Sequence, residues 1–242
     1  MTSAGKIIRE SLGLLLDKPK LFVPKVFSTL TASLFIVGVL SRSSSLSAID
    51  TTILVPAMFG GLFALTLIGV YSSMMLSYMV KESSSLRESF TGVKEKAFNV
   101  IGATLAILGF AVFMWLIAVA GYGIFYITGE VIILYAAAIF LLLMTFGFSY
   151  ISYFLPVTLL EDGLRSAIGS SYRTSSENKA VVTGLLLFSI LLLALAVTST
   201  GYLEKLGYAG FVAGRLVSTV VNTYIFTVSP TYYLESRAEN FD

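Results

Sequence analysis

The chain of 242 residues contains no cysteine and no histidine, and only 12% of its residues are charged. Without these two residue types it can form no disulfide, thiol nucleophile or imidazole base, and nearly every zinc, haem or iron–sulfur site is excluded. The net charge of +2 is too small to predict a nucleic-acid partner, which needs a clustered basic surface. Because 56% of the residues are hydrophobic and the mean hydropathy is +0.88, a soluble globular fold is excluded as well.

Long apolar runs dominate what is present. A membrane helix needs about 20 mainly apolar residues to cross about 30 Å of hydrocarbon. Six stretches qualify, over residues 21–40, 52–80, 97–119, 131–155, 180–198 and 208–232. The sequence therefore predicts an all-α polytopic membrane protein, folded as a single integral membrane domain over residues 1–242.

Lysine and arginine are distributed unevenly between the loops. Twelve of them lie in the N-terminal segment, the loops after the second and fourth stretches and the C-terminal tail, whereas the opposite loops hold Arg42 and Lys205. Because basic short loops resist translocation, we expect both termini in the cytoplasm and the protein in the cytoplasmic membrane. A cleavable signal peptide ending in the small residues 45–48 is the competing interpretation of the first stretch, but this stretch begins late and exceeds the usual apolar region of about 7–15 residues.

A short motif recurs three times at constant spacing. It reads Ile-Arg-Glu-Ser-Leu around Arg9, Leu-Arg-Glu-Ser-Phe around Arg87 and Leu-Arg-Ser-Ala-Ile around Arg165, with 78 residues between successive arginines. Each copy precedes a pair of apolar stretches, which predicts three helix-plus-hairpin repeats over about 1–80, 81–158 and 159–242. Such parallel repeats predict a quasi-threefold bundle around an axis along the membrane normal. Mitochondrial carriers share this parse, but their signature requires an acid after proline, and Pro24 is followed by residues 25–28 without one.

The three motif copies also carry apolar residues at helical spacing, as in Ile8, Leu12 and Leu15. Ser85 and Glu88 fit a capping box at the start of the second copy. We therefore expect short amphipathic helices along the cytoplasmic membrane surface, carrying Arg9, Arg87 and Arg165. Connectors that shield the end of the bundle are favoured over a dedicated lipid or partner site.

A polar stripe crosses the sixth apolar stretch, at the helical spacing i, i+3, i+4 and i+7 of Arg215, Ser218, Thr219 and Asn222. An arginine near the bilayer centre costs about 2.5–3.5 kcal/mol, so this face should avoid lipid. In one interpretation the stripe is the wall of a cavity that holds an anionic group. In the other, which the sequence favours, Arg215 snorkels or pairs with Glu130 or Asp50, and Asn222 makes one hydrogen bond between helices.

Other intramembrane residues receive structural interpretations. Lys25 lies about one turn from the cytoplasmic end of the first stretch, where it can snorkel to headgroup phosphates. Pro156 and Pro230 are expected to kink or end their helices.

Catalysis is not predicted. No carboxylate lies in the middle of an apolar stretch, and Glu161 and Asp162 are adjacent, so their side chains point about 100° apart on a helix. Asp162 is expected to cap the helix that follows. We expect no catalytic residue, no metal and no cofactor.

One region has a familiar pattern, formed by Phe154-Leu155-Pro156, Glu161-Asp162-Gly163, Arg165-Ser166-Ala167 and Ser170-Ser171, ending at Asn178 before an apolar stretch. With Lys18-Pro19-x-x-Phe22-x-Pro24 at the first stretch, it resembles a group of six-span membrane proteins. These include the membrane domain fused to bacterial glycerophosphodiester phosphodiesterases and related stand-alone polytopic proteins of unknown function. The phosphodiesterase barrel is not part of this chain, so the resemblance implies an accessory or scaffold role and transfers no catalytic residue.

Two functions follow as hypotheses. The favoured one is a membrane scaffold or lipid-interacting protein without catalytic activity, whose partners are the bilayer and either phospholipid headgroups or another membrane protein. The alternative is a permease or channel for a small solute, an anion in particular, along the bundle axis. A packed or lipid-filled interior supports the first, and a wetted polar route past Arg215 supports the second.

Overall fold

A computed structural model describes the backbone of residues 3–42 and 51–238 and the side chains of residues 3–35 and 58–238. Within these ranges the chain is helical and has no strand. The helices are α1 Ala4–Asp17, η1 Pro19–Phe22, α2 Val23–Arg42, α3 Thr51–Glu82, α4 Leu86–Glu95, α5 Ala97–Thr128, α6 Val131–Ser152, α7 Leu155–Glu161, α8 Leu164–Glu177, α9 Lys179–Glu204 and α10 Tyr208–Ala238.

Five helical segments among the described residues are long and apolar enough to cross a membrane: Met58–Glu82, Ala97–Thr128, Val131–Glu161, Lys179–Glu204 and Tyr208–Ala238. They confirm the all-helical membrane class. The first predicted span corresponds to α2, whose side chains are described only as far as Phe35, so a sixth span stays a prediction.

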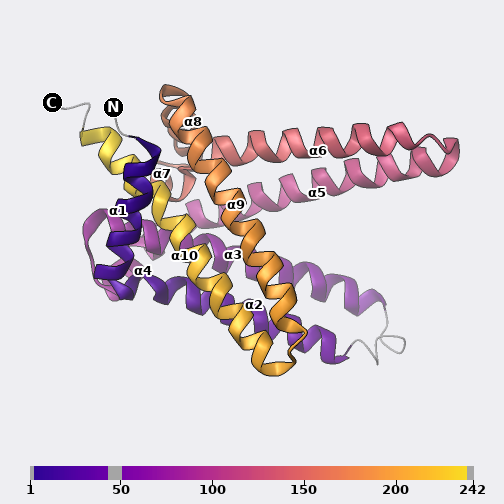
Figure 1. Ribbon diagram of the computed structural model, residues 1–242, viewed down its shortest axis with the longest axis horizontal. Coiled ribbons are helices and arrows are strands. Elements are labelled where there is room, and N and C mark those ends of the chain that lie inside the picture. The colour runs from indigo at the N-terminus through magenta and orange to yellow at the C-terminus, as the bar shows by residue number, and fades with distance from the viewer. Residues whose placement is uncertain (1–2, 43–50, 239–242) are drawn as a thin grey trace.

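The long helices form three hairpins, α2–α3, α5–α6 and α9–α10, which diverge from a common end of the molecule (Figure 1). The short helices α1, α4, α7 and α8 gather at that end, near both termini. A short helix thus precedes a hairpin three times along the chain, in the predicted order. That these units are repeats, and that the common end is cytoplasmic, remain predictions.

The buried core lies at the common end. One cluster packs α1, α7, α9 and α10 together through Ile7, Val157, Leu185 and Tyr232, joined by Phe154. In contrast, no residue of α6 is buried, and large apolar side chains along α5 and α6 are exposed. The outer halves of the hairpins therefore present the surface that a bilayer would cover.

The three motif copies share one pattern of burial. Two positions after each arginine stands a small residue that is fully buried, Ser11, Ser89 or Ala167. The next residue in each copy is apolar and exposed, as in Leu12 and Phe90, which are 50% and 53% exposed. Each short helix therefore packs on the bundle through a small side chain and turns an apolar one outward.

Local hydrogen bonds set the ends of the short helices. At α4 the Ser85 N–H donates to Glu88 Oε2 (2.7 Å) and the Glu88 N–H donates to Ser85 Oγ (3.3 Å), which confirms the capping box. The prediction for Asp162 is wrong, because Gly163 is the N-cap of α8 and Asp162 is the C-cap of α7. The Asp162 carboxylate instead accepts a hydrogen bond from the Ser170 hydroxyl (3.2 Å). Ser170 lies beyond the first turn of α8, whose N–H groups an N-cap would bind.

A break separates α6 from α7, where Pro156 lies in the first turn of α7. Serine hydroxyls satisfy the backbone groups that the break frees. Ser171 accepts from the Phe154 N–H (3.2 Å) and donates to the Ile151 carbonyl (2.5 Å). Ser229 of α10 donates to the Tyr153 carbonyl (2.7 Å). Irregular backbone of this kind is tolerated at membrane depth only where protein satisfies it. Pro230 differs, because α10 continues through it to Ala238.

Candidate functional site: a branched cavity between the hairpins

Arg215 lies near the start of α10 and is paired. Its Nη2 is 3.3 Å from Glu204 Oε1 at the end of α9, and its guanidinium carbon is 4.8 Å from the centre of the Phe211 ring. The pair joins the two helices of one hairpin next to their connecting turn. Arg215 therefore has Glu204 as its partner and not Glu130, while Asp50 lies outside the described residues.

The rest of the predicted stripe divides between two environments. Ser218 Oγ lies 3.0 Å from the Thr200 hydroxyl of α9, and the buried Thr219 donates to the Arg215 carbonyl of its own helix (2.8 Å). The contact between Ser218 and Thr200 joins α9 to α10, whereas the Thr219 hydrogen bond stays within α10. Asn222 alone reaches a cavity, and its amide makes no hydrogen bond with any described residue.

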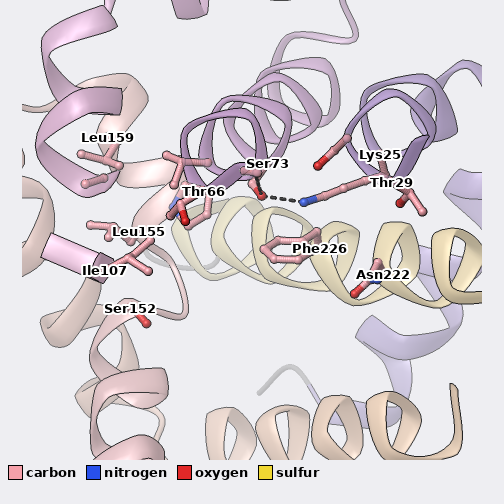
Figure 2. A pocket seen from close by; sticks show the side chains of 15 residues that line it. Lys25, Thr29, Thr66, Ser73, Ile107, Ser152, Leu155, Leu159, Asn222 and Phe226 are labelled. Carbon is pink, nitrogen blue, oxygen red and sulfur yellow. Dashed lines mark hydrogen bonds between the residues drawn. The ribbon is translucent and has the colours of Figure 1, made fainter. Parts of the chain in front are cut away.

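A cavity of about 430 Å³ lies where the three hairpins meet. Figure 2 shows α2, α3 and α10 on one side of it and residues from α5, α6 and α7 on the other. Its lining consists of Lys25, Ser28, Thr29, Thr66, Gly69, Val70, Ser73, Ala103, Ile107, Ser152, Leu155, Pro156, Leu159, Asn222 and Phe226. Polar and charged side chains come mainly from α2, α3 and α10, whereas α5 and α7 contribute apolar ones.

Lys25 is the charged residue of this cavity. Its side chain turns inward, so that only 6% of the residue is exposed, and the expected snorkelling to the surface is wrong. The ammonium donates to Ser73 Oγ of α3 (2.6 Å) and lies 3.5 Å from the centre of the Phe226 ring of α10 (Figure 2). These interior contacts, a charge-assisted hydrogen bond and a cation–π interaction, replace the headgroup contact.

No carboxylate among the described side chains pairs with Lys25. Ser73 is already engaged as a donor, to the Gly69 carbonyl (2.7 Å), so it can only accept from the ammonium. An ammonium has three donors, of which Ser73 takes one. The cavity therefore presents a lysine amino group with free donors and no carboxylate partner, beside hydroxyl and amide groups.

A second cavity of about 250 Å³ lies next to the first, between α6, α9 and α10. The two share Ser152, Pro156, Asn222 and Phe226 in their linings. The other lining residues of the second cavity are divided evenly between apolar side chains, Leu186, Ile190, Leu193 and Ile225, and hydroxyl-bearing ones, Ser149, Tyr153, Ser189 and Ser229. We call the first cavity the central chamber, the second the side branch, and the adjoining pair the branched cavity.

An ionic cluster ties α7 to its neighbours beside the chamber. Glu161, the last residue of α7, is 3.0 Å from Lys81 Nζ of α3 and 3.0 Å from Arg237 Nη2 of α10. Its carboxylate also accepts a hydrogen bond from the Tyr233 hydroxyl (2.8 Å). Because Pro156 and Leu159 of α7 line the chamber, this cluster fixes one of its walls.

The predicted membrane-surface arginines Arg9, Arg87 and Arg165 are all exposed on α1, α4 and α8. They lie outside the branched cavity. Among the described residues there is no group of three acidic residues that could hold a metal ion.

Sequence reasoning favoured a paired or snorkelling Arg215, placed a cavity charge at Arg215 only in its alternative interpretation, and missed Lys25. The available signal was the polar neighbourhood of Lys25, since Ser28 and Thr29 follow it within about one helical turn. A lysine that only snorkels needs no such neighbours.

Comparison with known protein families, curated proteins and solved structures finds no match. The site is therefore interpreted from its own chemistry.

Proposed function

We propose that the chain is a non-catalytic, lipid-interacting membrane protein that binds an anionic lipid in the central chamber, with the lipid's negative group at the Lys25 ammonium. The observation that carries this proposal is the burial of Lys25 without a carboxylate partner. Ionisable residues inside membrane proteins are costly, and they usually mark a ligand, ion or substrate site.

Energetics favour a ligand at this point. Removing a charge from water costs several kcal/mol, and buried charges are normally repaid by an opposite charge. Ser73 and Phe226 provide one hydrogen bond and one ring face, both neutral. A phosphate or carboxylate in the chamber would supply the missing charge and accept the free ammonium protons.

The shape of the chamber supports an amphiphile as the ligand. Its volume of about 430 Å³ lies within the usual range of about 300–1,000 Å³ for ligand sites. Hydroxyls of Thr29 and Thr66 line the part that α2 and α3 form with Lys25, whereas Ile107 and Leu159 line an apolar part. With both termini in the cytoplasm, as the basic loops favour, Lys25 would lie near the cytoplasmic leaflet, where anionic lipids are available.

A scaffold role is compatible with this proposal, since a bound lipid would stabilise the junction of the three hairpins.

A permease for a small anion is the second candidate. The permease is favoured by the position of Asn222, which lines both the chamber and the branch and would continue a polar route past α10. Anion flux that depends on Lys25, measured in vesicles, would support the permease.

The test is the affinity of the purified protein for dioctanoyl phosphatidic acid, measured in detergent by native mass spectrometry. We expect Lys25→Met to weaken binding by about tenfold to a hundredfold, because a hydrogen bond to a charged group is lost. Lys94→Met, which removes an exposed charge from α4, should leave the affinity unchanged. Two further probes separate the sources of the anion: glycerol 3-phosphate carries the phosphate without chains, and dioctanoyl phosphatidylcholine carries the chains without net charge. Equal affinities of the parent protein and Lys25→Met for phosphatidic acid would overturn the proposal.

A further inference from the structure

The side branch holds a buried polar group that the chamber does not explain. Tyr153, at the break between α6 and α7, lines the branch, and its hydroxyl is buried without a hydrogen bond to any described residue. The neighbouring Ser189 donates to the Leu185 carbonyl (2.8 Å), and Ser229 donates to the Tyr153 carbonyl. The phenol thus lacks a well-formed hydrogen bond at the side of a space lined by both apolar side chains and serine hydroxyls.

A buried donor without a well-formed hydrogen bond costs up to about 1–3 kcal/mol, so a ligand acceptor at this point would stabilise a complex. Leu186, Ile190, Leu193 and Ile225 give the branch an apolar wall beside its serine hydroxyls, so a molecule that combines one acceptor with an apolar chain fits the space. An acyl chain joined through an ester has this pattern, with one carbonyl oxygen at the head of a hydrocarbon.

The branch also adjoins the chamber. Asn222 and Ser152 belong to both linings, so a ligand whose charged group lies at Lys25 can extend into the branch past these two side chains. From the chamber to the branch, the binding groups would then follow the order of the parts of a glycerolipid. The phosphate would lie at the ammonium, the linkage oxygen near Tyr153, and the chain between α6 and α9.

The geometry points to the side branch as the binding site for one ester-linked acyl chain of the anionic lipid. This inference rests on the proposed function, which it deepens by naming the ligand as an ester-linked phosphoglycerolipid. Two determinants are assigned. The Tyr153 hydroxyl recognises the ester oxygen, and the apolar wall of the branch selects for chain length.

The first experiment compares ester-linked and ether-linked dioctanoyl and dioctyl phosphatidic acids on the parent protein and on Tyr153→Phe. An ether oxygen is a poorer acceptor than an ester carbonyl, so the parent protein should prefer the ester by about fivefold to tenfold. Tyr153→Phe keeps the ring and should abolish this preference while leaving ether binding unchanged. An equal preference in both proteins would overturn the role of the hydroxyl.

The second experiment blocks the branch. Ser149 of α6 lines it, so Ser149→Phe should fill the space and weaken the binding of dioctanoyl phosphatidic acid by tenfold or more. The matched control is Leu142→Phe on the same helix, where the side chain is 69% exposed, and it should have no effect. Chain length gives a second readout, because each pair of methylenes added within the branch should strengthen binding to the parent protein by about tenfold.

A third measurement does not depend on any variant. A phosphatidic acid with a diazirine in its acyl chain should crosslink to Leu186, Ile190 or Leu193 of α9. Crosslinks confined to the exposed faces of α5 and α6 would overturn the inference.

The variants distinguish the two proposals. Lys25-dependent binding with no effect of Ser149→Phe would overturn the inference and leave the proposed function standing. Binding independent of Lys25 would overturn both.

Discussion

The ammonium of Lys25 and the hydroxyl of Ser73 are 2.6 Å apart, and this hydrogen bond joins α2 to α3 inside the bundle. Burial removes the Lys25 side chain from water and leaves it with one neutral hydrogen-bond acceptor and one aromatic ring. Such an arrangement is a poor way to stabilise a fold and a suitable way to keep a positive charge ready for an anion. The expected behaviour of variants follows from this contrast.

Replacing Lys25 with methionine should make the lipid-free protein more stable. Methionine fills a similar volume without a charge to desolvate, and Ser73 keeps its bond to the Gly69 carbonyl. Exchange of buried charges for apolar groups stabilises some proteins by about 1–4 kcal/mol. Unfolding in detergent without added lipid measures this, with Lys94→Met as the surface control. A less stable Lys25→Met protein would show that the ammonium is a structural element.

Removing the Ser73 hydroxyl should have the opposite effect. Ser73→Ala deprives the ammonium of its only hydrogen-bond acceptor among the described residues and should lower the free energy of unfolding by about 1–3 kcal/mol. Ser72→Ala is a close control, because Ser72 is also buried and also donates to the Gly69 carbonyl, at 2.9 Å. In a Lys25→Met background, Ser73→Ala and Ser72→Ala should lower the free energy of unfolding by equal amounts. If Ser73→Ala still costs more there, Ser73 stabilises the protein independently of Lys25.

The break between α6 and α7 should depend on Ser171. Ser171→Ala leaves the Phe154 N–H and the Ile151 carbonyl without their side-chain partner in a site with no exposure. We expect a loss of about 1–3 kcal/mol in the free energy of unfolding. Ser170→Ala, one position earlier, removes only a hydroxyl that donates to the Asp162 carboxylate and should cost less. Equal losses would mean that the break does not need the serine.

Arg215 should prove structural. Its partner Glu204 has a side chain that is 40% exposed, so the coupling energy from a double-mutant cycle should be at most about 1 kcal/mol. Because neither residue lines the branched cavity, Arg215→Leu should leave phosphatidic acid binding unchanged. Weaker lipid binding in Arg215→Leu would restore the cavity role that its sequence position suggests.

The capping box of α4 predicts a pH dependence. The N–H and hydroxyl of Ser85 hold the pKa of Glu88 below its ordinary value of 4.5. A depressed pKa in the folded state means that the stabilisation is present above the unfolded pKa and is lost as pH falls through the folded one. Acid should therefore narrow the stability difference between the parent protein and Glu88→Ala. Thermal unfolding at pH 6 and in the acid range measures this, and a constant difference would argue against the box.

Much of the fold followed from local physics. Hydrophobic length predicted the long helices, and the Ser85–Glu88 spacing predicted the start of α4, because both signals lie within one segment. The motif around Arg9 predicted the order of short and long helices in the same way. The burial of Ser11 and the exposure of Leu12 depend on packing between segments, so the amphipathic pattern did not indicate which side faces the bundle.

The site was harder to predict for the same reason. Arg215 and Lys25 look alike in sequence, as single basic residues in apolar stretches, and their roles depend on what other helices bring. Glu204 lies 11 residues before Arg215, across a turn, whereas Ser73 lies 48 residues after Lys25. Only the tertiary arrangement shows that Arg215 has a carboxylate partner and that Lys25 has none among the described residues.

The most direct test of the account is a crystal structure grown from a lipidic mesophase that contains phosphatidic acid. The account predicts a phosphate oxygen within hydrogen-bonding distance of Lys25 Nζ, with one acyl chain between α6 and α9. A structure in which phosphatidic acid binds elsewhere and Lys25 keeps only its protein contacts would contradict the account.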